Sequence, residues 1–481
     1  MVFNSIPFLI FFVIVFFIYY TICKDKKQWQ NWLLLLASYF FLGYANWKML
    51  WLFIVATVVF YYLGIAIGKA NEKNQERLKV LGVVLGLGLL LYFKYLGFFI
   101  DSIASLLNAI GLHTNIHSFK IIMPLGISFF TFRLISYVLE VYDENIEPER
   151  DFVSFATYIS FFPCILSGPI DRPQFMHQLK AVRTFEYKNV ADGCRQFLWG
   201  LFKKVVVADN CAIYVDAAWG NIDGSSASTL VMAAILYSFE LYADFSGYSD
   251  MAIGVGKWLG LKITDNFKTP FFALNIADFW RRWHISLTKW MTDYVYTPLS
   301  FVMRDWKKWG TIMAIIVNFI LVGFWHGANW IYGVYGLYHG LLFVPLILSG
   351  AFAQKNEIRV NRWNLPKWID FSKMLLTFVL VTVSFLLFRS EDLSLFGHYI
   401  VRMCNDSILT IPYLMKRQFY IPTIIAILVM GIVEWVYRND LEALLRHSKY
   451  RCIRWLWYYM LIIACFYFSA KESAQFIYFQ F

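Results

Sequence analysis

The sequence predicts an all-α protein that crosses a membrane many times, and three observations support this fold class. Of the 481 residues, 59% are hydrophobic and only 16% are charged. Apolar runs of about 17–22 residues recur along the chain, which is the length that a helix needs to cross a bilayer. Short loops rich in lysine and arginine separate many of these runs, as on the cytoplasmic side of membrane proteins. We therefore expect one polytopic membrane domain over residues 1–481.

Charge and cysteine content argue against two other classes of protein. The net charge of +11 would suit a nucleic-acid partner. The basic residues, however, lie in short loops where topology alone requires them, so we expect no nucleic acid. Seven cysteines are scattered without a C-x-x-C pair, which predicts neither a disulfide framework nor a zinc site. The first apolar run is too long for a cleaved signal and lacks its basic start, so it is predicted to be the first span.

The first part of the chain predicts five spans and one hairpin. Lys24, Lys26 and Lys27 follow the first span and place the N-terminus outside the cell. Pro124 and Gly126 predict a break in the fifth span, because the backbone groups freed there need protein or a cavity to satisfy them. Basic loops on both sides of the next apolar run favour a re-entrant hairpin. The spans are expected at about 4–22, 30–47, 49–67, 80–100 and 120–142, and the hairpin at about 152–168.

The rest of the chain predicts seven spans and one irregular segment. Glu240 and Asp244 lie one helical turn apart in a span, which suits either a proton relay or hydrogen bonds to neighbouring spans. Residues 251–300 hold too many Gly, Pro, Arg and Trp residues for a helix in lipid, so we expect amphipathic or re-entrant helices embedded from the cytoplasmic side. This gives about twelve crossings with both termini outside. The spans are expected at about 196–218, 229–248, 311–326, 330–350, 373–389, 419–437 and 453–471.

One histidine lies deep inside an apolar span. His326 follows Trp325 at the end of the run at about 311–326, and a titratable group inside a membrane is costly unless it has partners or water. An imidazole that only bonds to a neighbouring helix is the simpler interpretation. Gly323 and Gly327 favour a function, because small residues beside the ring are expected to leave room for a ligand. Near neutral pH such an imidazole can take a proton from a hydroxyl or thiol and return it to a leaving group.

Other polar residues are candidates for lining a route to this histidine. His284 follows Arg281 and Arg282, whose cations suit the phosphates of a cytoplasmic carrier, although anchoring at the membrane interface is the commoner role of such residues. Asn275 and Asp278 also suit caps of short helices. The remaining candidates are Asn329, Trp325, Asp244 and Tyr248.

Motifs of several common chemistries do not occur in the sequence. It has no G-x-S-x-G, H-E-x-x-H or G-x-x-x-x-G-K, so we expect no serine nucleophile, zinc site or ATP site. His113 and His117 have metal-ligand spacing but no third ligand, and His339 is expected to be structural. We therefore predict no metal and no tightly bound cofactor. A buried histidine without a companion nucleophile suits direct transfer between two bound substrates.

Several distinctive motifs extend over nearly the whole length of the sequence, from MVFNSIPF at the N-terminus to FIYF near the C-terminus. Between them lie PLGISFFTF from Pro124, SGPI from Ser167, DFSGYSDMAIG from Asp244, WHISL around His284 and FWHG around His326. With these motifs the sequence resembles the membrane-bound O-acyltransferase family, in the branch of the bacterial alginate O-acetyltransferase membrane subunit. One departure is Asp171-Arg172-Pro173, where a more basic sequence is expected.

The resemblance implies a fold and roles for the two histidines. His326 would be the near-invariant catalytic histidine, and His284 the second signature position, lining a channel. About 11–12 transmembrane helices would form a ring around a thin centre. A catalytic core at about 119–350 would lie between N-terminal spans in 1–118 and C-terminal spans in 351–481.

The resemblance also implies substrates and partners. Similar proteins lie in the bacterial inner membrane among lipids and move an acyl group from a cytoplasmic thioester to an acceptor across the membrane. For this branch the resemblance implies acetyl-CoA as the donor and an exported polysaccharide as the acceptor. An extracytoplasmic partner of the SGNH-hydrolase type usually completes the acceptor side.

Two alternatives remain open at this point. D-alanyl transfer to teichoic acid uses a related membrane subunit and would need a docking surface for an acyl carrier protein in place of a CoA site. The N-terminal motif favours the alginate-type branch. A proton-coupled transporter or flippase would use Glu240, Asp244 and the histidines as relay groups, but it should show an inverted repeat, and the sequence shows none.

Overall fold

The computed structural model describes an all-helical chain. It covers residues 1–481 apart from 113–120, 355–356, 414–416, 440–449, 470–475 and 478–481. Over these described residues the only β-type pairing is an isolated bridge between Val360 and Pro366, so the all-α class is confirmed. Among them, five helical segments are long and apolar enough to cross a membrane, which are Lys27–Lys69, Glu72–Ala109, Lys308–His326, Trp330–Leu348 and Trp368–Arg389.

The chain folds into two compact units. Two long helices, α10 (Tyr187–Phe202) and α12 (Ala227–Trp258), are each divided between the units. His284 and His326 both belong to the second unit. The boundaries assign Met1–Phe197 with Ala252–Thr264 to the first unit, and Leu198–Met251 with Asp265–Phe481 to the second.

Helices of the first unit follow most of the predicted spans. The break predicted near Pro124 is present, because α6 begins only after Gly126, whose φ is 81°. A Cβ at Gly126 would lie 2.5 Å from the carbonyl oxygen of Ile165, so glycine is required there. The region of the predicted hairpin consists of short helices. The helices are α1 (Ile6–Thr21), α2 (Lys27–Asn46), α3 (Leu50–Lys69), α4 (Glu72–Leu90), α5 (Leu96–Ala109), α6 (Ile127–Tyr142), α7 (Phe152–Ser160), α8 (Phe162–Ile165) and α9 (Met176–Leu179).

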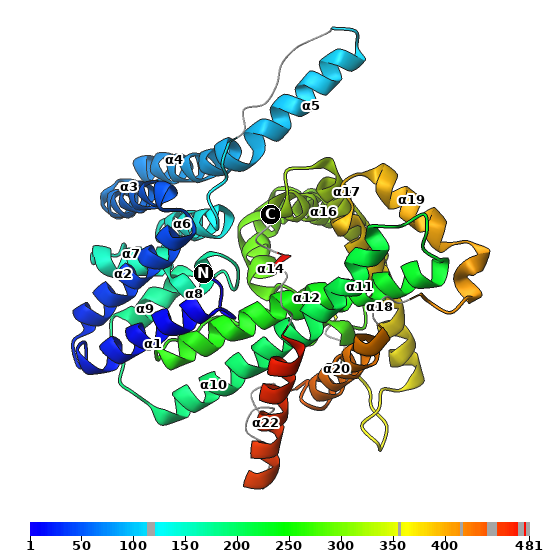
Figure 1. Ribbon diagram of the computed structural model, residues 1–481. Helices are drawn as coiled ribbons and strands as arrows, with labels where there is room; N and C mark the ends of the chain where they lie inside the picture. Colours follow the sequence, from blue (N-terminus) through cyan, green and yellow to red (C-terminus); the bar gives the residue numbers. More distant parts are fainter. Residues whose placement is uncertain (113–120, 355–356, 414–416, 440–449, 470–475, 478–481) are drawn as a thin grey trace. The chain divides into compact units, whose positions relative to one another are not determined.

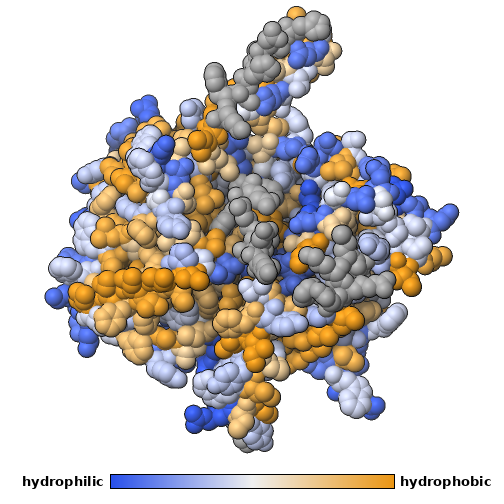
Figure 2. Space-filling view, in the orientation of Figure 1, coloured by the Kyte–Doolittle hydropathy of each residue, from blue (hydrophilic) through white to orange (hydrophobic). Residues whose placement is uncertain are grey.

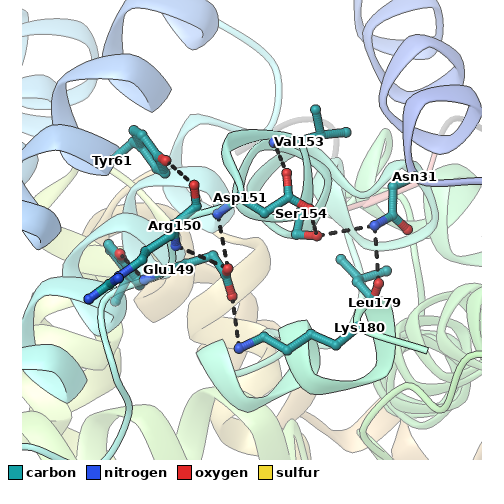
Figure 3. A network of polar contacts seen from close by, with 10 residues as sticks. Asn31, Tyr61, Glu149, Arg150, Asp151, Val153, Ser154, Leu179 and Lys180 are labelled. Atoms are coloured by element: carbon teal, nitrogen blue, oxygen red, sulfur yellow. Dashed lines mark hydrogen bonds and ion pairs between the residues drawn. The ribbon is translucent and has the colours of Figure 1, made fainter. Parts of the chain in front are cut away.

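A buried polar network joins the helices of the first unit (Figure 3). The side-chain amide of Asn31 on α2 donates to Ser154 Oγ on α7 and to the carbonyl oxygen of Leu179 on α9, each at 3.1 Å. On α3, the Tyr61 hydroxyl donates to the carbonyl oxygen of Arg150. These bonds satisfy polar groups inside the protein, which is necessary where lipid offers no partner.

Helices of the second unit surround the two histidines. In Figure 1 the ribbons of α12, α14, α16, α17 and α18 follow one another around a ring. Helix α19 (Leu393–Met403) was not predicted, because a helix this short is not recognised as a span. It packs Tyr399 inward and leaves Val401 exposed. The helices are α11 (Asp209–Trp219), α13 (Ile276–Arg282), α14 (Ile285–Met291), α15 (Thr297–Val302), α16 (Lys307–His326), α17 (Trp330–Leu348), α18 (Trp368–Arg389), α19 (Leu393–Met403), α20 (Arg417–Val436) and α22 (Arg451–Phe468).

Large apolar side chains are exposed on many of these helices. Leu9 and Val13 on α1, and Leu375 and Val379 on α18, are each about half exposed or more. Figure 2 shows hydrophobic residues spread over the face that is drawn. In water such a surface would be unfavourable, whereas hydrocarbon is its natural solvent. The exposure therefore agrees with an integral membrane protein.

Candidate functional site

His326 lies where two long helices meet. It is the last residue of α16, and its side chain is only 3% exposed. The backbone N–H of Gly327 donates to the carbonyl oxygen of Phe324 and ends the helix. Asn329 then caps α17 by accepting from the N–H of Ile331 at 3.1 Å. Asn329, a candidate for channel lining, is thus an exposed helix cap whose amide also donates to a neighbouring loop.

Close packing of α16 on α17 explains the glycines near His326. A Cβ at Gly323 would lie 2.0 Å from the carbonyl oxygen of Tyr332, and one at Gly336 would lie 2.2 Å from that of Phe319. At Gly327 a Cβ would lie 2.1 Å from the ring of Tyr332. The expectation that Gly323 and Gly327 leave room for a ligand is therefore wrong, because α17 fills that space.

Aromatic rings from three helices surround the imidazole of His326. Its ring centroid lies 4.9 Å from that of Trp325 on α16, 5.2 Å from that of Phe388 on α18 and 6.1 Å from that of Tyr335 on α17. All three contacts are edge-to-face. Such packing excludes water and strengthens electrostatic interactions at the imidazole.

His284 comes to the same site from an irregular stretch of chain. It lies between the short helices α13 and α14, in the left-handed conformation with a φ of 43°, and it is fully buried. Its ring centroid lies 5.6 Å from that of Trp325 and 6.5 Å from that of His326. The structure therefore brings together three sequence candidates, His284, Trp325 and His326. A left-handed histidine costs free energy, so the surrounding contacts must hold it in place.

Asn266, which the sequence analysis did not identify, makes some of those contacts. Nδ1 of His284 lies 3.1 Å from Oδ1 of Asn266, which is itself 1% exposed. The backbone N–H of Ile285 donates to the carbonyl oxygen of Asn266 at 2.9 Å, next to this contact. Phe245 packs edge-on against the other side of the ring, with centroids 4.7 Å apart. Asn266 lies in no recognisable motif, so sequence reasoning had no signal for it.

The polar residues of α13 form a structural cluster. Asn275 caps the helix by accepting from the N–H of Asp278 at 2.9 Å. Asp278 accepts from the N–H of Leu274 and pairs with Arg282 at 2.9 Å. Arg281 donates to two backbone carbonyl oxygens beyond α17. The bond from Asp278 N–H matches the capping alternative for Asn275. The two alternatives for the arginines, binding of a phosphate and anchoring at the membrane interface, stay predictions.

Asp244 belongs to a buried cluster of charges in the second unit. Its carboxylate pairs with Lys204 at 2.7 Å, and Lys204 also pairs with Asp209 at 2.8 Å. Tyr248, one turn further along α12, packs against Phe476 with ring centroids 5.2 Å apart. Pairing between helices therefore agrees with the structural alternative for Asp244. Lys204 was overlooked, although a lysine inside a predicted span is itself a signal for buried partners.

The remaining histidines are not part of a metal site among the described residues. Among the described residues, no group of three or more His, Cys, Asp or Glu side chains could hold a metal ion. His113 and His117 lie outside the described residues. Nδ1 of His339 accepts a hydrogen bond from the indole of Trp280 at 3.2 Å, as suits a structural histidine.

Two buried imidazoles among aromatic rings can accept a proton and return it. Imidazole titrates near neutral pH in water and can act as base and then as acid in one turnover. His326 offers this chemistry at the end of a rigid helix, and His284 offers it from a second direction. The geometry therefore suits proton transfer between two reactants that meet at these rings.

The chain is similar to known proteins over most of its length. The model of the membrane-bound O-acyltransferase family matches residues 39–388, which include both histidines. The probable alginate O-acetylase of Azotobacter vinelandii is 35% identical over 91% of this chain and 85% of its own. The peptidoglycan O-acetyltransferase of Helicobacter pylori is 34% identical over 82% and 78%, respectively. The teichoic acid D-alanyltransferase of Bacillus subtilis is 31% identical over 56% and 70%.

Proposed function

Because the chain belongs to the membrane-bound O-acyltransferase family, we propose that it moves an acetyl group from cytoplasmic acetyl-CoA to a polysaccharide outside the cell, with His326 as general base. Family membership makes the protein a membrane acyltransferase, and it argues against the transporter and flippase alternative. The bacterial relatives support a location in the inner membrane. The acetyl group is small and neutral, so it can pass a narrow protein route that the charged CoA cannot.

The observation that carries the proposal is the meeting of His326 and His284 in one buried aromatic site. Their ring centroids lie 6.5 Å apart, although the residues come from different elements of the second unit. A pair of imidazoles needs no metal or nucleophilic side chain to move a proton between two substrates. His326 is the better candidate for the base, because it ends a long, regular helix that fixes its position.

The proposed transfer balances in atoms and charge. His326 takes the proton of the acceptor hydroxyl as the hydroxyl oxygen attacks the thioester carbonyl carbon. The carbon–sulfur bond then breaks, and the imidazolium returns the proton to the sulfur. The products are an acetyl ester and the free thiol of CoA. An extracytoplasmic partner of the SGNH-hydrolase type would carry or position the acceptor.

D-alanyl transfer from a carrier protein is the second candidate. The similarity to the D-alanyltransferase of Bacillus subtilis covers 56% of the length of this chain, whereas the similarity to the probable alginate O-acetylase of Azotobacter vinelandii covers 91%. The greater coverage favours acetyl transfer. Membrane vesicles from polysaccharide-producing cells can decide between the donors. We expect label from acetyl-CoA to reach the polysaccharide, and label from a D-alanyl carrier protein to remain on the carrier; the opposite pattern would establish the second candidate.

The base is tested by replacing His326 in the same vesicles. We expect His326→Ala to lower acetyl transfer by about 10²–10⁴-fold, since general base catalysis supplies about that factor. The matched control is His339→Gln, which changes another buried histidine of the same unit and should keep most of the activity. Both variants must insert and purify like the wild type. Acetyl transfer by His326→Ala at the wild-type rate would overturn the assignment.

A further inference from the structure

Asn266 is the centre of a hydrogen-bond cluster beneath His284. Its Oδ1 lies 3.1 Å from Nδ1 of His284, 2.8 Å from Oγ of Ser286 and 3.3 Å from the backbone nitrogen of Ser286. Its Nδ2 donates to Oγ of Ser249 on α12 at 3.3 Å. Asn266, Ser286 and His284 are all buried, so these groups have to satisfy one another within the protein.

This cluster fixes which nitrogen of His284 carries a proton. The backbone nitrogen of Ser286 can only donate, so the side-chain atom of Asn266 that it meets must be the amide oxygen. An amide oxygen can only accept. Nδ1 of His284, which meets the same oxygen, must therefore carry a hydrogen and donate it. Whenever the ring is neutral, its lone pair lies on Nε2.

Backbone hydrogen bonds also hold the chain in place on both sides of His284. Two backbone hydrogen bonds, each of 2.9 Å, join the segment of Asn266 to the segment of His284. The N–H of Lys268 donates to the carbonyl oxygen of Arg282, and the N–H of Ile285 donates to that of Asn266. They flank His284, whose left-handed conformation they hold. The ring is thus fixed in orientation as well as in tautomer.

We propose that Asn266 is a positioning residue for acyl transfer, which holds His284 as the Nδ1–H tautomer so that Nε2 serves as a hydrogen-bond acceptor in the site. The role of Asn266 in acyl transfer rests on the proposed function, whereas the assignment of the tautomer does not. An Nε2 lone pair can accept the proton of a substrate hydroxyl or thiol, whereas the other tautomer would present a donor there. Among the described residues, His326 is a titratable side chain close to this ring, and Trp325 and Phe245 also pack against it.

The tautomer can be measured without any assay of activity. The protein contains eight histidines, so ¹⁵N-labelled histidine in detergent-solubilised protein gives few ring signals, and His284→Asn identifies the signal of interest. We expect multiple-bond ¹H–¹⁵N spectra to show an Nδ1–H imidazole at His284. In Asn266→Ala we expect that signal to change to the Nε2–H tautomer or to a mixture. An Nε2–H signal in the wild type would overturn the proposal.

The catalytic part is tested with three variants in the vesicle assay. We expect Asn266→Ala to lower kcat for acetyl transfer about 10- to 100-fold, which is the usual cost of losing a residue that orients a functional histidine. Asn266→Asp keeps an acceptor for Nδ1–H and should restore most of that loss. Its carboxylate also favours the protonated form of His284, which lacks the Nε2 acceptor. The acidic limb of the pH profile should therefore move up by about one to three pH units. Ser286→Ala, which removes another donor to the same oxygen, should leave the profile in place.

Outcomes for this residue and for the base are separable. If His326→Ala is inactive while Asn266→Ala has the wild-type kcat, only the proposal for Asn266 fails. If His326→Ala is fully active, the proposed base fails, and the spectra of His284 still decide the tautomer. An Asn266→Asp protein with an unmoved acidic limb would show that the residue acts on packing alone.

Discussion

The two histidines of the site are held in opposite ways. His326 ends the long helix α16, which packs closely on α17 through glycines, and aromatic side chains pack against its ring. His284 lies between two helices of seven residues each, in a left-handed conformation, and a hydrogen-bond cluster fixes its ring. The first histidine is positioned by rigid packing and the second by polar contacts.

This difference teaches where each position is sensitive to change. Packing of two helices fails when bulk is added, because backbone atoms cannot move aside locally. A hydrogen-bond cluster fails when a donor or acceptor is removed, because the remaining buried groups lose their partners. Substitutions of each kind can therefore test this contrast.

Added bulk between α16 and α17 should have the largest effect. In Gly336→Leu even the first side-chain atom would lie 2.2 Å from the carbonyl oxygen of Phe319, so the helices must separate. We expect the free energy of unfolding to fall by about 3 kcal/mol and acetyl transfer to be lost with it. Thermal unfolding in detergent measures the first effect. Gly397→Ala on α19, where a Cβ meets nothing within 4 Å, is the matched control and should unfold like the wild type. A stable Gly336→Leu protein would contradict the packing argument.

Replacement of the second histidine should reduce activity more than stability. His284→Asn keeps a residue that tolerates the left-handed conformation and can still donate to Asn266, but it removes the imidazole. We expect acetyl transfer to fall about 10²-fold while the unfolding temperature stays near that of the wild type. Unchanged transfer would mean that His284 only fills space beside Trp325.

Loss of the α13 cap should have a moderate effect on stability. Asn275→Ala removes the side chain that accepts from the N–H of Asp278, which typically costs about 1 kcal/mol. The helix leads directly to His284, so we expect a lower unfolding temperature together with a small decrease in acetyl transfer. An unfolding temperature equal to the wild type would show that the cap is dispensable.

The smallest effect is expected for the exposed arginine of α13. Among the described residues, Arg281 donates to the backbone carbonyl oxygens of Phe352 and Gln354, so Arg281→Ala should change the free energy of unfolding by less than about 1 kcal/mol. Its KM for acetyl-CoA separates the two interpretations of this cation. A raised KM would support a role in binding phosphates of the donor, and an unchanged KM would support anchoring.

Much of the fold could be predicted because it depends on local patterns. Apolar runs of bilayer length predicted α16 and α17. The position of His326 inside such a run marked it as a functional candidate. Short elements were harder. α19 has only 11 residues, and its buried face is recognised only from the fold, in which Tyr399 packs inward and donates to the carbonyl oxygen of Leu230 at 2.9 Å.

Local sequence patterns were enough to identify a helical membrane protein, to place His326 at the end of a span and to reveal the motifs of an acyltransferase family. The three-dimensional arrangement was needed to see that His284 lies beside His326 and that Asn266 contacts it. It also showed that the nearby glycines admit a helix and leave no room for a ligand. The physical reason is that hydropathy and motifs are properties of neighbouring residues in the chain. The orientation of a buried ring depends on donors and acceptors that the fold brings from elsewhere.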